Sequence, residues 1–303
     1  MKPLQKIIFS IATLISSVTF AGVTDWVEFN LSSGHIKIPS VIEGIDGFTI
    51  IDSGASINGI NKAFINLNNL TFEEGLPIYV RGVHGKEKVK LINNVKVKIF
   101  GADIKLSQLI RTNIGRKETQ LLLGAPFLEK FIVQLDYPNS RLRFITRNSI
   151  DLRKSKNLIT KRDESTGLPI VKVEIDGVLS WLLLDTGSSG GLYLERNIAK
   201  KNGWLEKYST NEDILIKGIT RTKVANQLQL PIFTFGPFKL EDVPAYVPED
   251  GAKLQITRRV VNTGTRISQS KKVQGILGYD ILKHFVITLD YKNGLVHVAP
   301  PEN

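Results

Sequence analysis

The sequence predicts an all-β protein made of two pseudo-symmetric lobes with only short helices. Three observations support this prediction: the chain repeats itself, its apolar segments are mostly short β-type runs, and turn-forming residues bound these runs. Its 303 residues amount to roughly two domains of about 150 residues each. A hydrophobic content of 42% is ordinary for a chain that buries real cores. Disordered and fibrous proteins are therefore excluded.

The internal repeat appears at two different offsets. A shift of 133 residues aligns segment 42–56 with segment 175–189, and both read as a hairpin, an apolar strand and then Asp-(Ser/Thr)-Gly. A shift of 154 residues aligns segment 123–137 with segment 277–291, and seven of these fifteen positions are identical. The two shifts differ by 21 residues, so the second copy carries an insertion of about that size. The basic segment 253–272 is the candidate for this insertion.

Individual elements follow from local patterns. Asp176-Gly177 between two apolar runs is a strong signal for a two-residue hairpin turn. Three short helical patterns, two of which follow a glycine, predict one or two helical turns each. Expected strands include 91–100, 141–146, 168–175 and 295–299, and expected short helices are 125–131, 194–202 and 279–285.

The N-terminus is typical of a secretory signal peptide. Lys2 and Lys6 precede an apolar run over 7–18, and small side chains follow near residue 21. The run is too short for a bilayer core, which needs roughly 20 apolar residues. We therefore expect export to a bacterial periplasm or secretion, without stable membrane insertion after cleavage. A first helix that anchors the chain to a membrane is the alternative.

These boundaries give an expected organisation in four parts. We expect a signal peptide over 1–21, an N-terminal lobe over 22–150, a polar linker over 151–165 and a C-terminal lobe over 166–303. Two lobes within one chain make a monomer sufficient, although a dimer is not excluded.

Composition and charge exclude several classes of function. The chain has no cysteine, which excludes disulfide frameworks, iron–sulfur ligation and thiol nucleophiles. Its four histidines are scattered without the i, i+4 spacing of a helical metal site, so we expect no metal and no cofactor. The net charge of +11 is concentrated at 147–162 and 253–272, and neither segment interleaves aromatic residues for base stacking. A solvated linker and loop explain these segments better than a nucleic-acid partner.

Two aspartates end similar apolar strands in the two copies. Asp52 follows the apolar run 48–51, and Asp185 follows the apolar run 181–184. A buried carboxylate is costly unless its charge is shared, hydrogen-bonded or functional. A single Asp-Ser-Gly is most often a turn. Two such motifs in a repeated context predict that pseudo-symmetry brings both aspartates to a shared axis.

The residues around both aspartates resemble a known family. Asp52-Ser53-Gly54-Ala55 and Asp185-Thr186-Gly187-Ser188 are each followed by an apolar-apolar-Gly element, ending at Gly124 and Gly278. This pattern is similar to the pepsin and retropepsin clan of aspartic proteases, and most similar to bacterial retropepsin-like domains duplicated in tandem. The resemblance implies a bilobal acid-protease fold with β-barrel-like lobes, in which Asp52 and Asp185 activate a water for peptide hydrolysis. It also implies that Ser53 and Thr186 bond across the axis and stiffen the pair.

Elementary electrostatics supports this role. Two carboxyl groups about 3 Å apart share one proton, so one acts as a base toward water and the other as an acid toward the scissile carbonyl. Gly54 and Gly187 are expected to leave room for substrate and water. Ser188 follows Gly187 where the first copy has Ala55, so an extra hydroxyl is available to Asp185. We therefore expect Asp185 to be the ionised member and Asp52 to carry the proton.

In the family, a hairpin between the aspartate and the second glycine closes over the substrate. The candidates here are 79–85 and its counterpart 216–221. Tyr79, Gly82 and Gly218 are the residues expected in these flaps.

Three alternatives remain beside an aspartic endopeptidase that cleaves extended peptides or proteins. The first is an esterase, because segment 187–191 fits the Gly-x-Ser-x-Gly pattern and His284 or His297 would then complete a triad. The second is a catalytically silent protein of the same fold that binds peptides or acts as a scaffold in the cell envelope. In the third, both Asp motifs are simple turns.

Overall fold

A computed structural model describes residues 22–31, 34–82, 85–163, 167–217, 222–251, 254, 258–259 and 273–301. The expected signal peptide, Gly218 and most of segment 253–272 lie outside the described residues. Within the described residues the protein is mostly β-structure with six short helices. No helix there is long and apolar enough to span a membrane.

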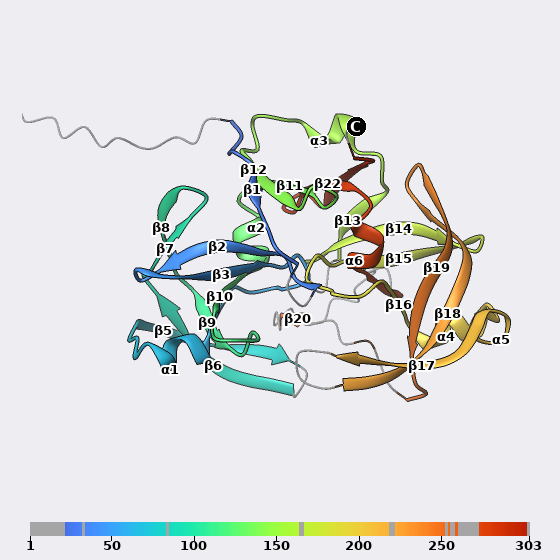
Figure 1. The fold of residues 1–303 in the computed structure, drawn as a ribbon, viewed down its shortest axis with the longest axis horizontal. Helices are drawn as coiled ribbons and strands as arrows, with labels where there is room; N and C mark the ends of the chain where they lie inside the picture. The colour runs from blue at the N-terminus through green and yellow to red at the C-terminus, as the bar shows by residue number, and fades with distance from the viewer. Residues whose placement is uncertain are drawn as a thin grey trace, which may run out of the picture.

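The first lobe is built on a ten-stranded sheet (Figure 1). Its strand order is β20-β5-β6-β9-β4-β10-β3-β2-β7-β8, and the sheet curls into a half-barrel. Buried isoleucines such as Ile38 and Ile60 fill its core. The strands are β2 (Lys37–Ile42), β3 (Ile45–Ile51), β4 (Gly59–Asn61), β5 (Glu73–Gly82), β6 (Gly85–Asn93), β7 (Val95–Ile99), β8 (Ala102–Leu106), β9 (Leu109–Thr112), β10 (Thr119–Leu123) and β20 (Arg258–Arg259).

The second lobe is a closed barrel. Its eight-stranded sheet runs β13-β14-β15-β21-β16-β19-β18-β17, and pairing of β14 with β18 closes six of these strands on themselves. Trp204, Phe233 and Phe235 are fully buried in this lobe. The strands are β13 (Thr160–Arg162), β14 (Pro169–Ile175), β15 (Val178–Leu184), β16 (Leu192–Leu194), β17 (Ser209–Lys217), β18 (Thr222–Phe235), β19 (Phe238–Pro248) and β21 (Gly275–Leu277).

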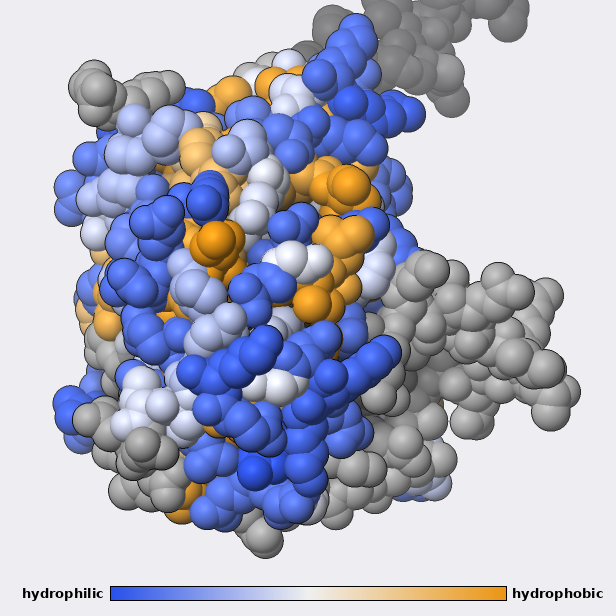
Figure 2. Space-filling view, turned by 90° about the vertical axis from the view of Figure 1, so that its right-hand side faces the viewer, coloured by the Kyte–Doolittle hydropathy of each residue, from blue (hydrophilic) through white to orange (hydrophobic). Residues whose placement is uncertain are grey.

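Closure of the barrel turns the apolar residues of the second lobe inward. Figure 2 views the molecule from the side of this lobe and shows a mostly hydrophilic surface on which apolar residues form separate small groups. Leu179 on β15 is one of the large apolar side chains that stay exposed. Such scattered exposure is normal for a protein surface.

A third sheet joins the two lobes. Its order is β1-β12-β11-β22-β23, so strands from the two halves of the chain meet where β11 pairs antiparallel with β22. Figure 1 shows this sheet between the lobes. Its strands are β1 (Val27–Glu28), β11 (Ile132–Asp136), β12 (Arg141–Ile145), β22 (Val286–Asp290) and β23 (Leu295–Ala299). The structure therefore confirms the predicted two-lobed all-β fold.

The helices are short, as predicted. Helices α2, α4 and α6 fall on the predicted helical patterns, but α2 and α6 each end about three residues earlier than expected. The helices are α1 (Lys62–Leu67), α2 (Ala125–Leu128), α3 (Leu152–Ser155), α4 (Arg196–Lys201), α5 (Trp204–Tyr208) and α6 (Tyr279–Leu282).

Two local predictions have different outcomes. Asp176 and Gly177 have φ values of 46° and 77° and join β14 to β15, which confirms the predicted hairpin turn. The predicted single strand over 91–100 is wrong: Asn94, with φ 59°, separates the end of β6 at Asn93 from the start of β7 at Val95. Asparagine tolerates this left-handed conformation, so the continuous apolar pattern conceals a change of direction.

The basic insertion contributes a strand to the other lobe. Arg258 and Arg259 form β20, which pairs antiparallel with Arg81 and Val80 of β5. A segment expected to be only a loop of the second copy thus adds two residues to the sheet of the first lobe.

Candidate active site

Each aspartate follows a strand that is paired on both sides in the same way in the two lobes. Asp52 follows β3, which pairs antiparallel with β2 and parallel with β10. Asp185 follows β15, which pairs antiparallel with β14 and parallel with β21. The backbone N–H of Asp52 donates to the carbonyl of Leu123 and that of Asp185 donates to the carbonyl of Leu277, both at 3.0 Å. The repeat in sequence is thus a repeat in strand pairing.

The two aspartates meet between the lobes. Their carboxyl groups share a hydrogen bond. Each carboxylate also accepts the backbone N–H two residues further along: Gly54 donates to Asp52 Oδ1, and Gly187 donates to Asp185 Oδ1, each at 2.8 Å. The chain therefore presents a pair of adjacent carboxyls in two equivalent turns.

Ser53 and Thr186 cross-link the two turns. The hydroxyl of Ser53 donates to the carbonyl of Leu184 and accepts the N–H of Thr186, both at 2.9 Å. The hydroxyl of Thr186 accepts the N–H of Ser53 at 2.9 Å and donates to the carbonyl of Ile51 at 3.4 Å. Both side chains are buried. Four reciprocal hydrogen bonds thus fix the two aspartates relative to one another.

The glycines of both motifs face the opposite aspartate. A Cβ at position 54 would lie 2.5 Å from the Asp185 carboxyl carbon, and a Cβ at position 187 would lie 2.3 Å from the Asp52 carboxyl carbon. This corrects the expectation that Gly54 and Gly187 make space for substrate and water, because the space they leave is filled by the other lobe's carboxyl group.

The second glycine elements support the same turns. A Cβ at Gly124 would lie 2.4 Å from the carbonyl oxygen of Ala55, and a Cβ at Gly278 would lie 2.5 Å from the carbonyl oxygen of Gly190. Gly124 also donates its N–H to Asn58 Oδ1 at 2.9 Å. The glycines let strands β10 and β21 approach the aspartate turns closely before α2 and α6 begin.

The electrostatics of the pair is asymmetric. Burial raises the pKa of Asp52, while the Gly54 N–H and the charge of His35 oppose this effect. Burial together with the negative charge of Asp52 raises the pKa of Asp185 well above its usual range. The larger rise falls on Asp185, which favours the shared proton on Asp185 and the negative charge on Asp52.

This assignment is opposite to the one expected from Ser188. Its backbone N–H supports the Asp185 turn, but its hydroxyl lies toward Gly278, where a Cβ would come within 2.7 Å of it. Among the described residues, the Ser188 hydroxyl makes no hydrogen bond to Asp185. The predicted preference for an ionised Asp185 therefore loses the hydroxyl on which it depended, and it stays a prediction.

Two tyrosines pack near the aspartates and differ in their bonding. Tyr291 is fully buried, and its hydroxyl donates to the carbonyl of Ser53 at 3.0 Å. Tyr137 is buried at the equivalent position, and its hydroxyl has no hydrogen-bond partner among the described residues. Burial raises the pKa of both phenols, and the negative charges of Asp52 and Asp185 add to this shift. The repeated Leu-Asp-Tyr at 135–137 and 289–291 marks these tyrosines in the sequence, although the motif alone indicates no role for them.

Both candidate flaps belong to β-hairpins. Tyr79 is exposed on β5, and Gly82 ends this strand opposite Gly85 of β6. In the second lobe, β17 and β18 form the corresponding hairpin, and Lys217 pairs with Thr222 next to its tip. His84 and Gly218 lie outside the described residues.

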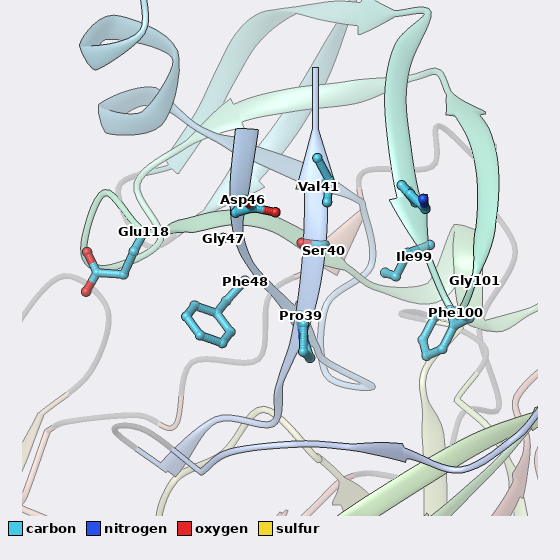
Figure 3. Close-up of a pocket in the computed structure, with 11 residues that line it drawn as sticks. Pro39, Ser40, Val41, Asp46, Gly47, Phe48, Ile99, Phe100, Gly101 and Glu118 are labelled. Carbon is cyan, nitrogen blue, oxygen red and sulfur yellow. The ribbon is translucent and has the colours of Figure 1, made fainter. Parts of the chain in front are cut away.

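A separate hollow lies on the first lobe (Figure 3). Strands β2, β3 and β7 and the turn after β7 surround it, and Pro39, Val41, Phe48 and Phe100 contribute its apolar lining. Neither Asp52 nor Asp185 lines this hollow. It is therefore not part of the aspartate site.

Metal and triad chemistry receive no support from the described part of the chain. No group of three or more potential metal ligands occurs among its residues. The Nδ1 atom of His297 contacts the carbonyl oxygen of Ser155 at 2.5 Å, and Ser189 packs against Gly34. These contacts join neither residue into a nucleophile–base pair.

These features define two β lobes that hold a cross-braced pair of aspartates at their junction. Residues 171–281 match a family model described as aspartyl protease. The matched segment contains Asp185-Thr186-Gly187 and Gly278, so the second lobe is similar to an aspartyl protease domain. No curated protein matches the chain. Asp52 lies outside the matched residues.

Proposed function

We propose that this protein is an aspartic endopeptidase in which Asp52 and Asp185 together activate a water for hydrolysis of peptide bonds. The observation that carries the proposal is the reciprocal bracing of the two aspartate turns by Ser53 and Thr186. Simple turns would not need carboxyls that share a hydrogen bond across two lobes, because desolvating two acids is costly.

The charge asymmetry of the pair gives each carboxyl a role. The Asp52 carboxylate is the base that accepts a proton from water as the water attacks the peptide carbonyl. Protonated Asp185 donates a hydrogen bond to the carbonyl oxygen, where negative charge develops. The proton taken by Asp52 then passes to the leaving amine. No cofactor enters this sequence of steps.

The substrate class is an extended peptide or protein segment. The β5–β6 and β17–β18 hairpins support this proposal, since exposed strands bind extended peptides through their backbone groups. Tyr79, Gly82 and Gly218 are the proposed flap residues. One chain supplies both aspartates, so a monomer suffices.

We further propose that residues 1–21 direct export to a periplasm or to the exterior. The basic start and the apolar run over 7–18 support this proposal. The N-terminal lobe would then span 22–150, the linker 151–165 and the C-terminal lobe 166–303.

The test is cleavage of a diverse peptide library from pH 3 to pH 8 by wild type, Asp52→Asn, Asp185→Asn and the control Asp103→Asn. Asp103 is exposed on β8. We expect each dyad variant to lose at least about 100-fold in kcat/KM, since acid–base groups contribute this much or more. The control should retain wild-type activity. Cleavage that survives either dyad substitution would refute the mechanism, and no cleavage by wild type would favour the silent peptide-binding alternative.

A further inference from the structure

The two lobes differ at the residue that faces each aspartate across its hairpin. Lys37 of β2 pairs with Ile50 of β3, and the N–H of Ile51 donates to the carbonyl of Ile36. One further step along this antiparallel ladder places His35 opposite Asp52. Directly opposed residues lie on the same face of a sheet with Cβ atoms about 5 Å apart.

The second lobe has a leucine at the equivalent place. Ile170 of β14 pairs with Leu183 of β15, so the same extension places Leu168 opposite Asp185. Leu168 is fully buried. The 133-residue shift of the repeat also aligns His35 with Leu168 and Gly34 with Gly167. The two glycines have φ values of 74° and 72°, so the two backbones are equivalent and only the side chains differ.

Contacts from the second lobe hold the segment that carries His35. A Cβ at Gly34 would lie 2.2 Å from the Cβ of Ser189, so segment 34–35 packs against the loop that follows Asp185. The Nδ1 atom of His35 is buried and has no hydrogen-bond partner among the described residues. The backbone ladder thus places the imidazole opposite Asp52, and its Nδ1 has no structural hydrogen bond among the described residues.

We infer that His35 is a positioning residue which, as an imidazolium, keeps the negative charge of the pair on Asp52 and leaves the shared proton on Asp185. This inference rests on the proposed function, which it refines by assigning a cause to the asymmetry of the two aspartates. The charge of His35 acts on Asp52 in the direction that favours ionisation. Leu168 offers no such charge to Asp185.

Few other charges face His35. Asp52 lies across the ladder, and Lys37 shares its face of β2 two residues further on. Ser189 packs against Gly34, and Asp185 is the sole titratable residue in the sequence of its loop, 185–191. Lys37 is a second cation on this face of the ladder, so any titration assay needs a variant that separates the two residues.

The test compares His35→Gln, which is neutral and polar, with His35→Lys, which keeps a cation, and with the controls Lys37→Gln and His297→Gln. His297 contacts Ser155 and lies on β23, an edge strand of the sheet that joins the lobes, away from the two aspartates in the sequence. Without a neighbouring cation, Asp52 stays protonated to higher pH. We expect the acid limb of the kcat/KM profile to move up by about 1 pH unit in His35→Gln. His35→Lys should retain the wild-type acid limb, and both controls should shift it by less than half as much.

A second readout does not need catalysis. Carbon-13 NMR of labelled aspartate carboxyls, with Asp52 assigned by Asp52→Asn, should show the same upward shift of the Asp52 titration in His35→Gln. If wild type cleaves no peptide, the proposed function fails while this titration still tests His35. An unchanged Asp52 titration in His35→Gln would overturn the inference. So would a shift that His35→Lys does not reverse, because it would indicate a packing role instead of a charge.

Discussion

Asp185 lies in a turn whose hydrogen bonds match those of Asp52, yet it is the more strongly perturbed acid. Burial and the charge of Asp52 raise its pKa well above the usual value. Because this pKa is higher in the folded than in the unfolded chain, the proton on Asp185 stabilises the folded state. This stabilisation is fully present at pH values below the pKa of Asp185 in the unfolded chain. It is lost as the pH rises through the folded pKa.

Replacing Asp185 with asparagine should therefore stabilise the protein at neutral pH, while activity is lost. The amide cannot ionise, so the cost of a second buried charge disappears. We expect the free energy of unfolding at pH 7 to rise by at least about 1 kcal/mol, and the difference from wild type to shrink toward pH 4. Urea unfolding at both pH values measures this effect. The exposed control Asp103→Asn should change stability little at either pH, and a destabilised Asp185→Asn at pH 7 would contradict the assignment.

A second prediction for a single residue concerns Gly54. A methyl group at position 54 would fall 2.5 Å from both carboxyl oxygens of Asp185, so Gly54→Ala must push the two aspartates apart. We expect a loss of stability of about 1–3 kcal/mol and a larger relative loss of kcat/KM than of substrate binding. In the comparison variant Gly75→Ala, the new methyl group would lie 2.6 Å from the end of the Asn93 side chain, which can rotate away, and 3.3 Å from the Cβ of Leu91. Equal activity of Gly54→Ala and wild type would show that the close approach is not required.

The sequence predicted the two aspartates that meet in the structure better than it predicted their surroundings. Asp52 and Asp185 stand out because a repeated motif ends each apolar strand. The direction of the Ser188 hydroxyl and the role of Gly54 depend on the opposite lobe, which no local pattern encodes. His35 was detectable, because extending the alignment upstream by a few residues sets it against Leu168.

At the level of elements, strands β11 and β22 deliver the two tyrosines beneath the aspartate turns. Each strand is followed directly by its tyrosine, and the two strands pair with one another. Asp136 and Asp290, the last residues of these strands, accept hydrogen bonds from Asn139 and Asn293 and pair with Arg141 and Arg147. The repeated Leu-Asp-Tyr thus ends each strand with a capped turn and a buried phenol.

The two tyrosines form a matched pair for mutation. Tyr291→Phe leaves the buried carbonyl of Ser53 without its donor, so we expect a loss of about 1 kcal/mol in stability and a lower kcat. Tyr137→Phe removes a hydroxyl that has no partner among the described residues, so we expect unchanged or increased stability. Thermal unfolding and steady-state kinetics of both variants test the difference. A larger loss in Tyr137→Phe than in Tyr291→Phe would contradict the bonding pattern.

Element boundaries show where prediction from sequence reaches its limit. The Asp176-Gly177 turn was predictable because its φ values demand such residues. The break at Asn94 was not, since Val95 and Val97 continue the apolar alternation of β6 into β7. Likewise, the pairing of β20 with β5 joins segments more than 170 residues apart, and the basic composition of the insertion gives no sign of it.

Across the whole molecule, the two lobes share structure that links their stability. The β11–β22 pair makes one sheet from both halves of the chain, and the bracing of Ser53 and Thr186 adds hydrogen bonds between them. The aromatic contact between Tyr137 and Tyr279 also joins the two halves, with ring centroids 6.1 Å apart. Since the joining sheet and the site both need both lobes, we expect the lobes to unfold as one cooperative unit.

This cooperativity can be measured with a probe in one lobe and a cavity in the other. Trp204 is fully buried in the second lobe, and the background Trp26→Phe with Trp181→Phe makes it the single fluorescent reporter. Ile38→Ala opens a cavity in the core of the first lobe and should cost about 3 kcal/mol. If the lobes unfold together, the Trp204 transition shifts to lower urea concentration by an amount that matches this loss. Leu76 is exposed, so the control Leu76→Ala should leave the transition in place. An unmoved Trp204 transition in Ile38→Ala would show that the lobes unfold independently and that the shared sheet does not couple them.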